Sequence, residues 1–262
     1  MAPRRLLALL LLATPLLARA DAAPVIEIVD DARVGEPRVV ELRALFTRWA
    51  AREYRYLQAQ GPKPIKILLS KRAGPGLYVG DQILMPPNDP HEMLETFVHE
   101  LAHHITGHDS SFFFKEGIAT HTLEALFAQD HRIPQSWPQY GQSNDAWVNL
   151  FSHRGQLISL KQALAWPRYD GSSAEGDFHS WQVYCMAGSF IGWYIGRYGY
   201  DAFLQAFRDE APGQPAAELE QQWLKSIHDQ QLALFDPAQA LPQRARYRGF
   251  ARRLSAAAPA GR

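Results

Sequence analysis

The sequence predicts an α+β fold, and two observations indicate it. Between residues 24 and 109, short strand-like segments are interleaved with two segments that have helical periodicity. After residue 110, nearly every periodic segment has the spacing of a helix. This order favours a small mixed or antiparallel sheet packed on a helix and followed by a mainly helical lobe, rather than a doubly wound sheet. We expect one domain over residues 24–250, divided into lobes at 24–109 and 110–250.

The first lobe is predicted to contain strands marked by apolar runs and helices marked by an apolar stripe. The predicted strands are 24–29, 64–72 and 76–88, of which the last is either one strand or a hairpin. The predicted helices are 37–61 and 89–109. The first helix has Gly61 at the position just past its expected end, and the second has Asp89 as its expected N-cap.

The second lobe is predicted to be helical around an irregular stretch at 132–177. The predicted helices are 112–129, 159–166, 178–199, 201–207 and 215–227. The only cysteine, Cys185, falls in a strongly apolar helical pattern, which favours a buried inert thiol over a disulfide with another chain. Residues 251–262 are rich in Ala and Arg, and we expect them to form a disordered tail.

The first 20 residues have the pattern of a signal peptide. Arg4 and Arg5 precede an apolar run at 6–17, and Ala18-Arg19-Ala20 forms an A-x-A cleavage site. An uncleaved N-terminal anchor is the alternative. The length of the run counts against it, because a membrane span needs roughly 20 apolar residues. We expect an exported protein, periplasmic or extracellular, with no stable membrane insertion after cleavage.

The charge balance argues against a nucleic-acid partner. The chain has 27 basic and 27 acidic residues, and nucleic-acid binding would favour a basic excess. Apolar residues make up 47% of the chain, enough for a core. The sequence does not indicate an oligomeric state.

The hexapeptide HELAHH at 99–104 contains the pattern His-Glu-x-x-His. On a helix, His99 and His103 point to one side, so both imidazoles can bind one Zn²⁺ ion. Glu100 can then reach a water in the open coordination position and act as general base. The alternative is the polar stripe of an ordinary helix. The apolar flanking residues count against it, because buried histidine and glutamate would be costly without partners.

Other nearby histidines fit a third ligand position poorly. His108 is one residue out of register with the metzincin pattern, which requires a histidine at 109. His104 is rotated by about 100° from its neighbour on the helix, and His91 is nearly two turns before the motif.

Glu116 is the better candidate for the third ligand. It follows His103 after 12 intervening residues, which leaves room for a turn and the start of a second helix. The small neighbours Gly117 and Ala119 permit close approach of two helices. An ordinary surface glutamate is the alternative, but the flanking FFF and GIA segments are not typical of a surface.

Taken together, HELAHH, FKEGIATH and YCMAGSFIGWYIGRYG resemble the gluzincin metallopeptidases, in particular the short peptidase MA-like domains. The resemblance covers roughly residues 64–210 and implies a zincin-like fold. It implies Zn²⁺ bound by His99, His103 and Glu116, with Glu100 as base and acid. One position departs from the pattern, because Thr120 stands where relatives often carry an acid that orients a ligand histidine. Glu95 or backbone carbonyls are possible substitutes for it.

The resemblance also suggests how substrate is held. Tyr184 matches the tyrosine of the family's late helix and is expected to donate to the oxyanion, with His179 as the alternative. A packed core aromatic is the other interpretation of Tyr184. Substrate backbone is expected to pair with the 76–84 segment, and residues 132–177 to form a lid or one wall of the cleft.

The sequence therefore predicts an exported zinc peptidase that acts on a peptide or protein substrate. In this hypothesis, water activated by Zn²⁺ attacks a peptide carbonyl, and Glu100 moves its proton to the leaving amine. A zinc- or peptide-binding module of the same fold without turnover is one alternative. A helical domain without metal is the other.

Overall fold

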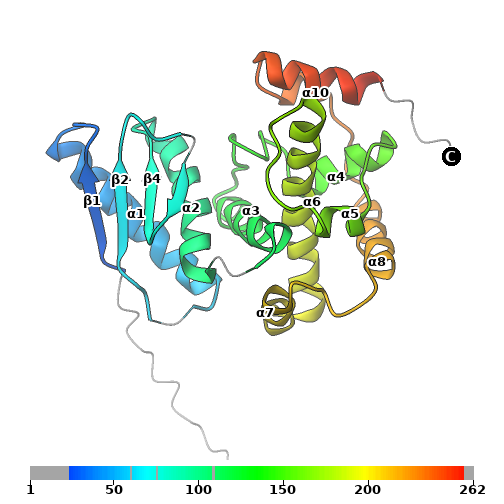
Figure 1. Cartoon of the computed structure of the whole chain (residues 1–262), viewed down its shortest axis with the longest axis horizontal. Helices are drawn as coiled ribbons and strands as arrows, with labels where there is room; N and C mark the ends of the chain where they lie inside the picture. The colour runs from blue at the N-terminus through cyan, green and yellow to red at the C-terminus, as the bar shows by residue number, and fades with distance from the viewer. Residues whose placement is uncertain (1–23, 60, 75, 108–109, 257–262) are drawn as a thin grey trace, which may run out of the picture.

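The computed structural model describes residues 24–256, apart from 60, 75, 108 and 109. The predicted signal peptide at 1–20 and the final residues 257–262 lie outside the described residues. Within the described part the fold is α+β, with ten helices and one four-stranded mixed sheet (Figure 1). Among the described residues, no helix combines the length and apolar character that crossing a membrane requires.

The sheet comes entirely from the first lobe, in the order β1-β2-β4-β3. Its strands are β1 (Ile26–Asp30), β2 (Ile65–Leu69), β3 (Leu77–Val79) and β4 (Gln82–Met85). β1, β2 and β4 are parallel, whereas β3 runs antiparallel to β4. The 76–88 segment is thus a hairpin, and its turn residues Gly80 and Asp81 both have positive φ, as a tight two-residue hairpin turn requires. β3 is left as an edge strand.

Two helices belong to this lobe, α1 (Glu36–Tyr56) and α2 (Pro90–Thr106). The prediction that Gly61 lies just past the end of the first helix was wrong. Gln58 has a φ of 50°, and the N–H of Ala59 bonds back to the carbonyl of Tyr54, so the helix already ends at Tyr56. The N-cap of α2 is confirmed, because Asp89 accepts the N–H of His91 at 2.8 Å.

The helical lobe contains eight helices among the described residues. They are α3 (Phe112–Ala128), α4 (Asn144–His153), α5 (Leu160–Leu164), α6 (Ala174–Tyr198), α7 (Tyr200–Asp209), α8 (Ala216–Asp229), α9 (Pro237–Ala240) and α10 (Ala245–Ala256). α4 was not predicted, although Ser143 caps it and Trp147, Val148 and Phe151 form an apolar stripe. α6 begins four residues before the predicted start at 178, because Ser173 caps it.

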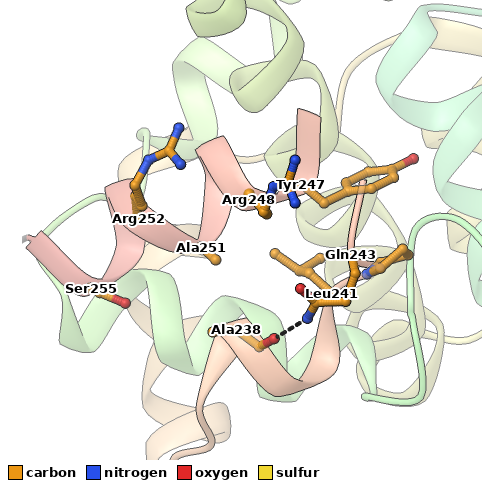
Figure 2. A pocket seen from close by; sticks show the side chains of 9 residues that line it. Ala238, Leu241, Gln243, Tyr247, Arg248, Ala251, Arg252 and Ser255 are labelled. Atoms are coloured by element: carbon orange, nitrogen blue, oxygen red, sulfur yellow. Dashed lines mark hydrogen bonds between the residues drawn. The ribbon is translucent and has the colours of Figure 1, made fainter. Parts of the chain in front are cut away.

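The prediction of a disordered tail from residue 251 was wrong as far as Ala256. α10 continues to that residue, and its buried side chains Phe250, Ala251 and Leu254 join a core cluster with α4 and α6. α10 also faces the short α9, and the Gln243 side chain between them donates to the Ala238 carbonyl at 3.1 Å (Figure 2). Cys185 lies in the same cluster, fully buried, and burial raises the pKa of its thiol well above the usual value. This confirms the prediction of a buried thiol.

α3 joins the two parts of the fold, because its ends pack into different cores. Phe113, Phe114 and Ile118 belong to a cluster with α5, α6, α7 and α8. Leu126 and Phe127, at the other end, belong to the cluster of the sheet, α1 and α2. α3 therefore lies between the sheet lobe and α6 (Figure 1).

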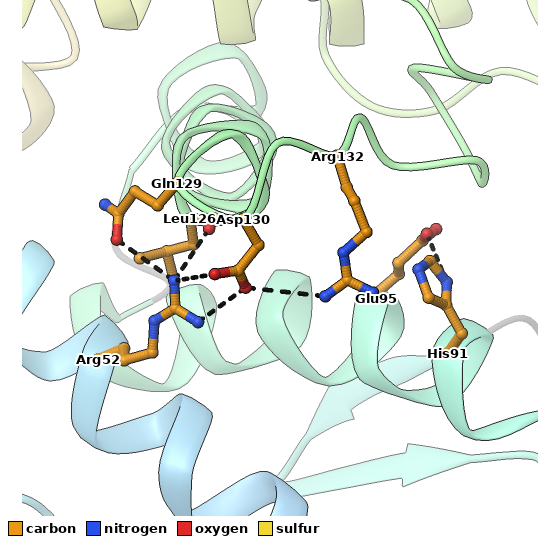
Figure 3. Close-up of polar contacts among 7 residues, drawn as sticks. All are labelled: Arg52, His91, Glu95, Leu126, Gln129, Asp130 and Arg132. Atoms are coloured by element: carbon orange, nitrogen blue, oxygen red, sulfur yellow. Dashed lines mark hydrogen bonds and ion pairs between the residues drawn. The ribbon is translucent and has the colours of Figure 1, made fainter.

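A polar contact fixes the far end of α3 to α1. Arg52 on α1 donates to both carboxylate oxygens of Asp130 and to the carbonyl of Leu126, with a shortest distance of 2.9 Å to Asp130 (Figure 3). Its guanidinium also stacks 4.2 Å from the ring centre of Trp49. These contacts orient α3 against the sheet lobe.

Glu124 on α3 gives the fold a testable pH dependence. Burial, together with the negative charge of Asp145, raises the pKa of Glu124 from 4.5 to about 7, in spite of the hydrogen bond from the Asn144 N–H. Since the protonated form is favoured in the folded state, the contribution of Glu124 to stability is present below pH 4.5 and is lost as the pH rises through about 7.

We expect Glu124→Gln to remove this dependence while keeping an acceptor for Asn144. The measured quantity is the free energy of unfolding of the variant minus that of the unmodified protein. This difference should be up to about 3 kcal/mol larger at pH 8 than at pH 4.5. Urea unfolding at both pH values measures this, with the exposed Glu218→Gln as control. A difference that is the same at both pH values would contradict the prediction.

Candidate metal centre

The structure brings His99, His103 and Glu116 together where α2 packs against α3. One ligand atom from each lies within 4.8 Å of the other two, and this is the only such group of three or more among the described residues. The Oε2 atom of Glu116 is 3.2 Å from Nε2 of His99 and 3.3 Å from Nε2 of His103. The two imidazole rings are nearly perpendicular, with centres 5.0 Å apart.

These separations fit the donors of a single small cation. Donor atoms about 2.05 Å from a tetrahedral zinc ion stand about 3.3 Å from one another. The two measured distances agree with this spacing. Two imidazole nitrogens and a carboxylate oxygen are also donors that zinc commonly takes in proteins. The residues present therefore fit the ion that the motif predicts.

The shifted pKa values of His99 and Glu116 also favour a bound cation. Burial lowers the pKa of His99, but the hydrogen bond with Glu116 and the charges of Glu100 and Glu116 outweigh it, so the pKa lies above its usual value. Burial raises the pKa of Glu116, but His103 and His99 outweigh this effect and hold it well below the usual range. Two imidazoles directed at one buried carboxylate thus favour positive charge between them, which bound protons or a metal cation can supply.

Glu116 reaches the histidines because α3 is held closely against α6. A Cβ atom at the next residue, Gly117, would lie 2.8 Å from the Ile191 side chain and 3.0 Å from Ala187. Any larger residue at position 117 would displace Ile191 or Ala187, so α3 and α6 can come this close only with glycine there. The sequence assigned this close approach to the helix that carries the two histidines, but the helix that Gly117 contacts is α6.

Glu100 points toward the hairpin, beside the histidine pair. Its Oε2 accepts the backbone N–H of Tyr78 on β3 at 2.9 Å, and its side chain is only 9% exposed. The hairpin can come this near because Gly76 has a φ of 124° and a Cβ there would lie 2.2 Å from the Thr96 side chain. The sequence reasoning missed this contact, since a backbone donor leaves no signal in residue types.

Tyr184 on α6 lies against the same site. Its ring centre is 6.4 Å from that of His99 and 5.5 Å from that of Trp137. Burial raises the pKa of Tyr184 well above its usual value, and the carboxylates of Glu116 and Glu100 add to this, so the hydroxyl keeps its proton. His179, the alternative donor, instead interacts with Gln182 and Glu175 and makes an edge-to-face contact with Trp166.

A cleft of about 520 Å³ opens onto the site. His99, Glu100 and Gly76 lie on its metal side. Its other walls are aromatic and come from distant parts of the chain: Trp137, Tyr169, Tyr184 and Tyr247. Residues of the 132–177 stretch therefore form one wall of the cleft, which is one of the two roles predicted for it.

Glu95 does not take the role that the sequence suggested for it. Instead of orienting a ligand histidine, its two oxygens accept the backbone N–H groups of Gln135 and Ser136, at 3.1 and 2.9 Å. His91 also pairs with it, at 3.0 Å between Nδ1 and Oε1 (Figure 3). The buried carboxylate therefore fixes the start of the aromatic wall next to Trp137.

The remaining candidates lie away from the ligand triad or outside the described residues. The Nδ1 atom of His104 is 3.3 Å from the Tyr78 hydroxyl, and His108 lies outside the described residues. Thr120 is fully buried at the α3–α6 contact, where its methyl group would lie 2.7 Å from a Cβ atom at Gly188. The Thr120 side chain thus packs against Gly188 of α6.

Comparisons of the chain with protein-family models, with curated proteins and with solved structures gave no match.

The role of Glu95 can be tested by hydrogen exchange. Glu95→Ala removes the carboxylate that accepts two backbone N–H groups, so the amides of Gln135 and Ser136 should exchange at least tenfold faster. Glu92→Ala, which removes an exposed acid from the same helix, is the matched control. Unchanged exchange in the Glu95 variant would show that other contacts hold this wall.

Proposed function

We propose that the protein is a zinc-dependent metallopeptidase of the gluzincin type, with a zincin-like arrangement of sheet and active-site helix. The observation that carries the proposal is the convergence of donor atoms from His99, His103 and Glu116 within 4.8 Å of one another, beside Glu100 and an open cleft. In this proposal the three residues bind Zn²⁺, and Glu100 is the general base and acid.

The chain's own residues supply the proton movements. Bound zinc would contribute Lewis acidity, which makes a nearby water more acidic. Glu100 then accepts a proton from the attacking water and passes it to the leaving amine. The Tyr78 N–H fixes one carboxylate oxygen of Glu100, and the other is free to receive the proton. The Tyr184 hydroxyl, which keeps its proton, can donate to the oxyanion that develops on the substrate carbonyl.

The edge strand supports a peptide substrate. Leu77 on β3 lines the cleft, and no strand from residues 24–256, where they are described, pairs with the outer side of β3. An extended peptide could add there as a further strand, with its scissile bond directed toward Glu100. The predicted signal peptide, together with the absence of any other apolar run long enough for a membrane span, supports an exported location.

One observation favours the alternative of a binding module without turnover. One oxygen of Glu100, the proposed base, is already occupied by the Tyr78 N–H. If this bond persisted with substrate bound, the site could retain zinc and bind peptide without cleaving it.

The ligand set and the base can be separated by substitution. We expect the protein to bind one equivalent of zinc, and His103→Ala and Glu116→Gln to lose it, since each removes one of three donors. Glu100→Gln should keep its zinc, because glutamine can still accept the Tyr78 N–H, but should hydrolyse casein roughly 10²–10⁴-fold more slowly. Zinc is measured by elemental analysis and hydrolysis by peptide release.

The exposed His228→Ala is the matched control for the loss of a histidine. Full zinc content in the Glu116 or His103 variant would refute the ligand set. Turnover by Glu100→Gln would refute the role of the base, and zinc binding without hydrolysis by the unmodified protein would support the alternative.

Tyr184→Phe tests the proposed oxyanion donor. The ring packing against Trp137 is kept and only the hydroxyl is lost, so kcat should fall by about 10²–10³-fold with little change in KM or zinc content. His179→Gln, the matched control, should keep its full rate. Equal effects of the two substitutions would indicate that Tyr184 is only a packing residue.

A further inference from the structure

The end of the chain concentrates positive charge on α10 and the residue just before it. Five arginines fall between residues 244 and 253, and no acidic residue occurs between 237 and 256. The whole chain is formally neutral, so the rest of it has 22 basic against 27 acidic residues. α10 is thus a cationic element on a molecule that is otherwise acidic.

Two arginines on the outer face of α10 have no counter-charge in the part of the chain that the structure describes. Arg248 and Arg252 are exposed, and neither has an ion-pair partner among the residues that the structure describes. Arg52 on α1 differs, because Asp130 neutralises it (Figure 3). The apolar side of α10 is already buried against α6, so the helix packs without using these charges.

An apolar groove lies next to these arginines, between α9 and α10 (Figure 2). It has a volume of about 590 Å³, and Ala238, Leu241 and Ala251 contribute apolar surface to it. Arg248 and Arg252 line it on the α10 side. Apolar surface beside unpaired guanidinium groups matches a ligand that is anionic at one end and apolar at the other.

We propose that the α10 surface, formed by Arg248, Arg252 and the adjoining groove, binds anionic phospholipid at a membrane surface. Guanidinium groups pair with lipid phosphates, and the groove accepts the apolar part of the lipid next to the headgroup. The anionic membrane repels the acidic remainder of the molecule. This repulsion orients the protein with α10 toward the membrane. The apolar groove favours a lipid over a nucleic acid, whose phosphates offer no matching apolar part.

This surface is continuous with the cleft described above. Tyr247 of α10 lines both the groove and the cleft, and its hydroxyl accepts a 2.7 Å hydrogen bond from that of Tyr140. A membrane bound at α10 would therefore lie next to the cleft. The binding itself requires neither zinc nor hydrolysis, so it can be tested independently of the proposed activity.

The test is cosedimentation of the full chain with lipid vesicles. We expect binding to phosphatidylcholine vesicles that contain about a third phosphatidylglycerol, and none to phosphatidylcholine alone. Added salt should weaken the binding, because the attraction is electrostatic. The double substitution Arg248→Gln and Arg252→Gln should weaken it roughly 30-fold, at about fivefold for each arginine.

The matched control removes two exposed arginines from α1, by Arg43→Gln and Arg48→Gln, and should change binding less than twofold. Circular dichroism checks that both variants fold. Equal binding to neutral and anionic vesicles, or equal losses in the two double variants, would overturn the proposal. Binding of a DNA duplex as tight as that of the anionic vesicles would overturn it too, by showing a general polyanion surface.

Discussion

The pairing of the Glu116 carboxylate with the Nε2 atoms of His99 and His103 is the contact on which the proposed function depends. It joins α2, which packs on the sheet, to α3, which packs on α6. Buried polar groups of this kind are costly unless each finds a partner. Here Glu116 is the partner of both histidines. A cation bound between them would give all three side chains a partner at once.

The surroundings of the triad are organised by further buried carboxylates. Glu100 bonds the hairpin backbone at Tyr78, and Glu95 bonds the backbone at Gln135 and Ser136. One helix thus fixes both sides of the cleft through two side chains that are five residues apart. The aromatic wall is then completed from α6 and α10, so the cleft depends on helices that are far apart in the sequence.

Much of this could be predicted from local patterns. The α+β class, the hairpin at 76–88 and the α2 N-cap depend on alternation, turn residues and capping, which are local in sequence. The convergence of His99, His103 and Glu116 follows from helical spacing and a close second helix. The contacts of Glu95 and Glu100 could not be predicted, because their partners are backbone N–H groups that depend on tertiary packing. α10 was missed for a similar reason, since its Leu254 and Phe250 are apolar but their burial depends on α6.

Anomalous diffraction at the zinc absorption edge, from crystals of the zinc-loaded protein, would locate the ion itself. We expect one strong peak about 2.0–2.2 Å from Nε2 of His99, Nε2 of His103 and a carboxylate oxygen of Glu116. We also expect Glu100 to make no bond to the ion. A peak at other residues, coordination by Glu100 in place of Glu116, or no peak at this site would refute the proposed metal centre.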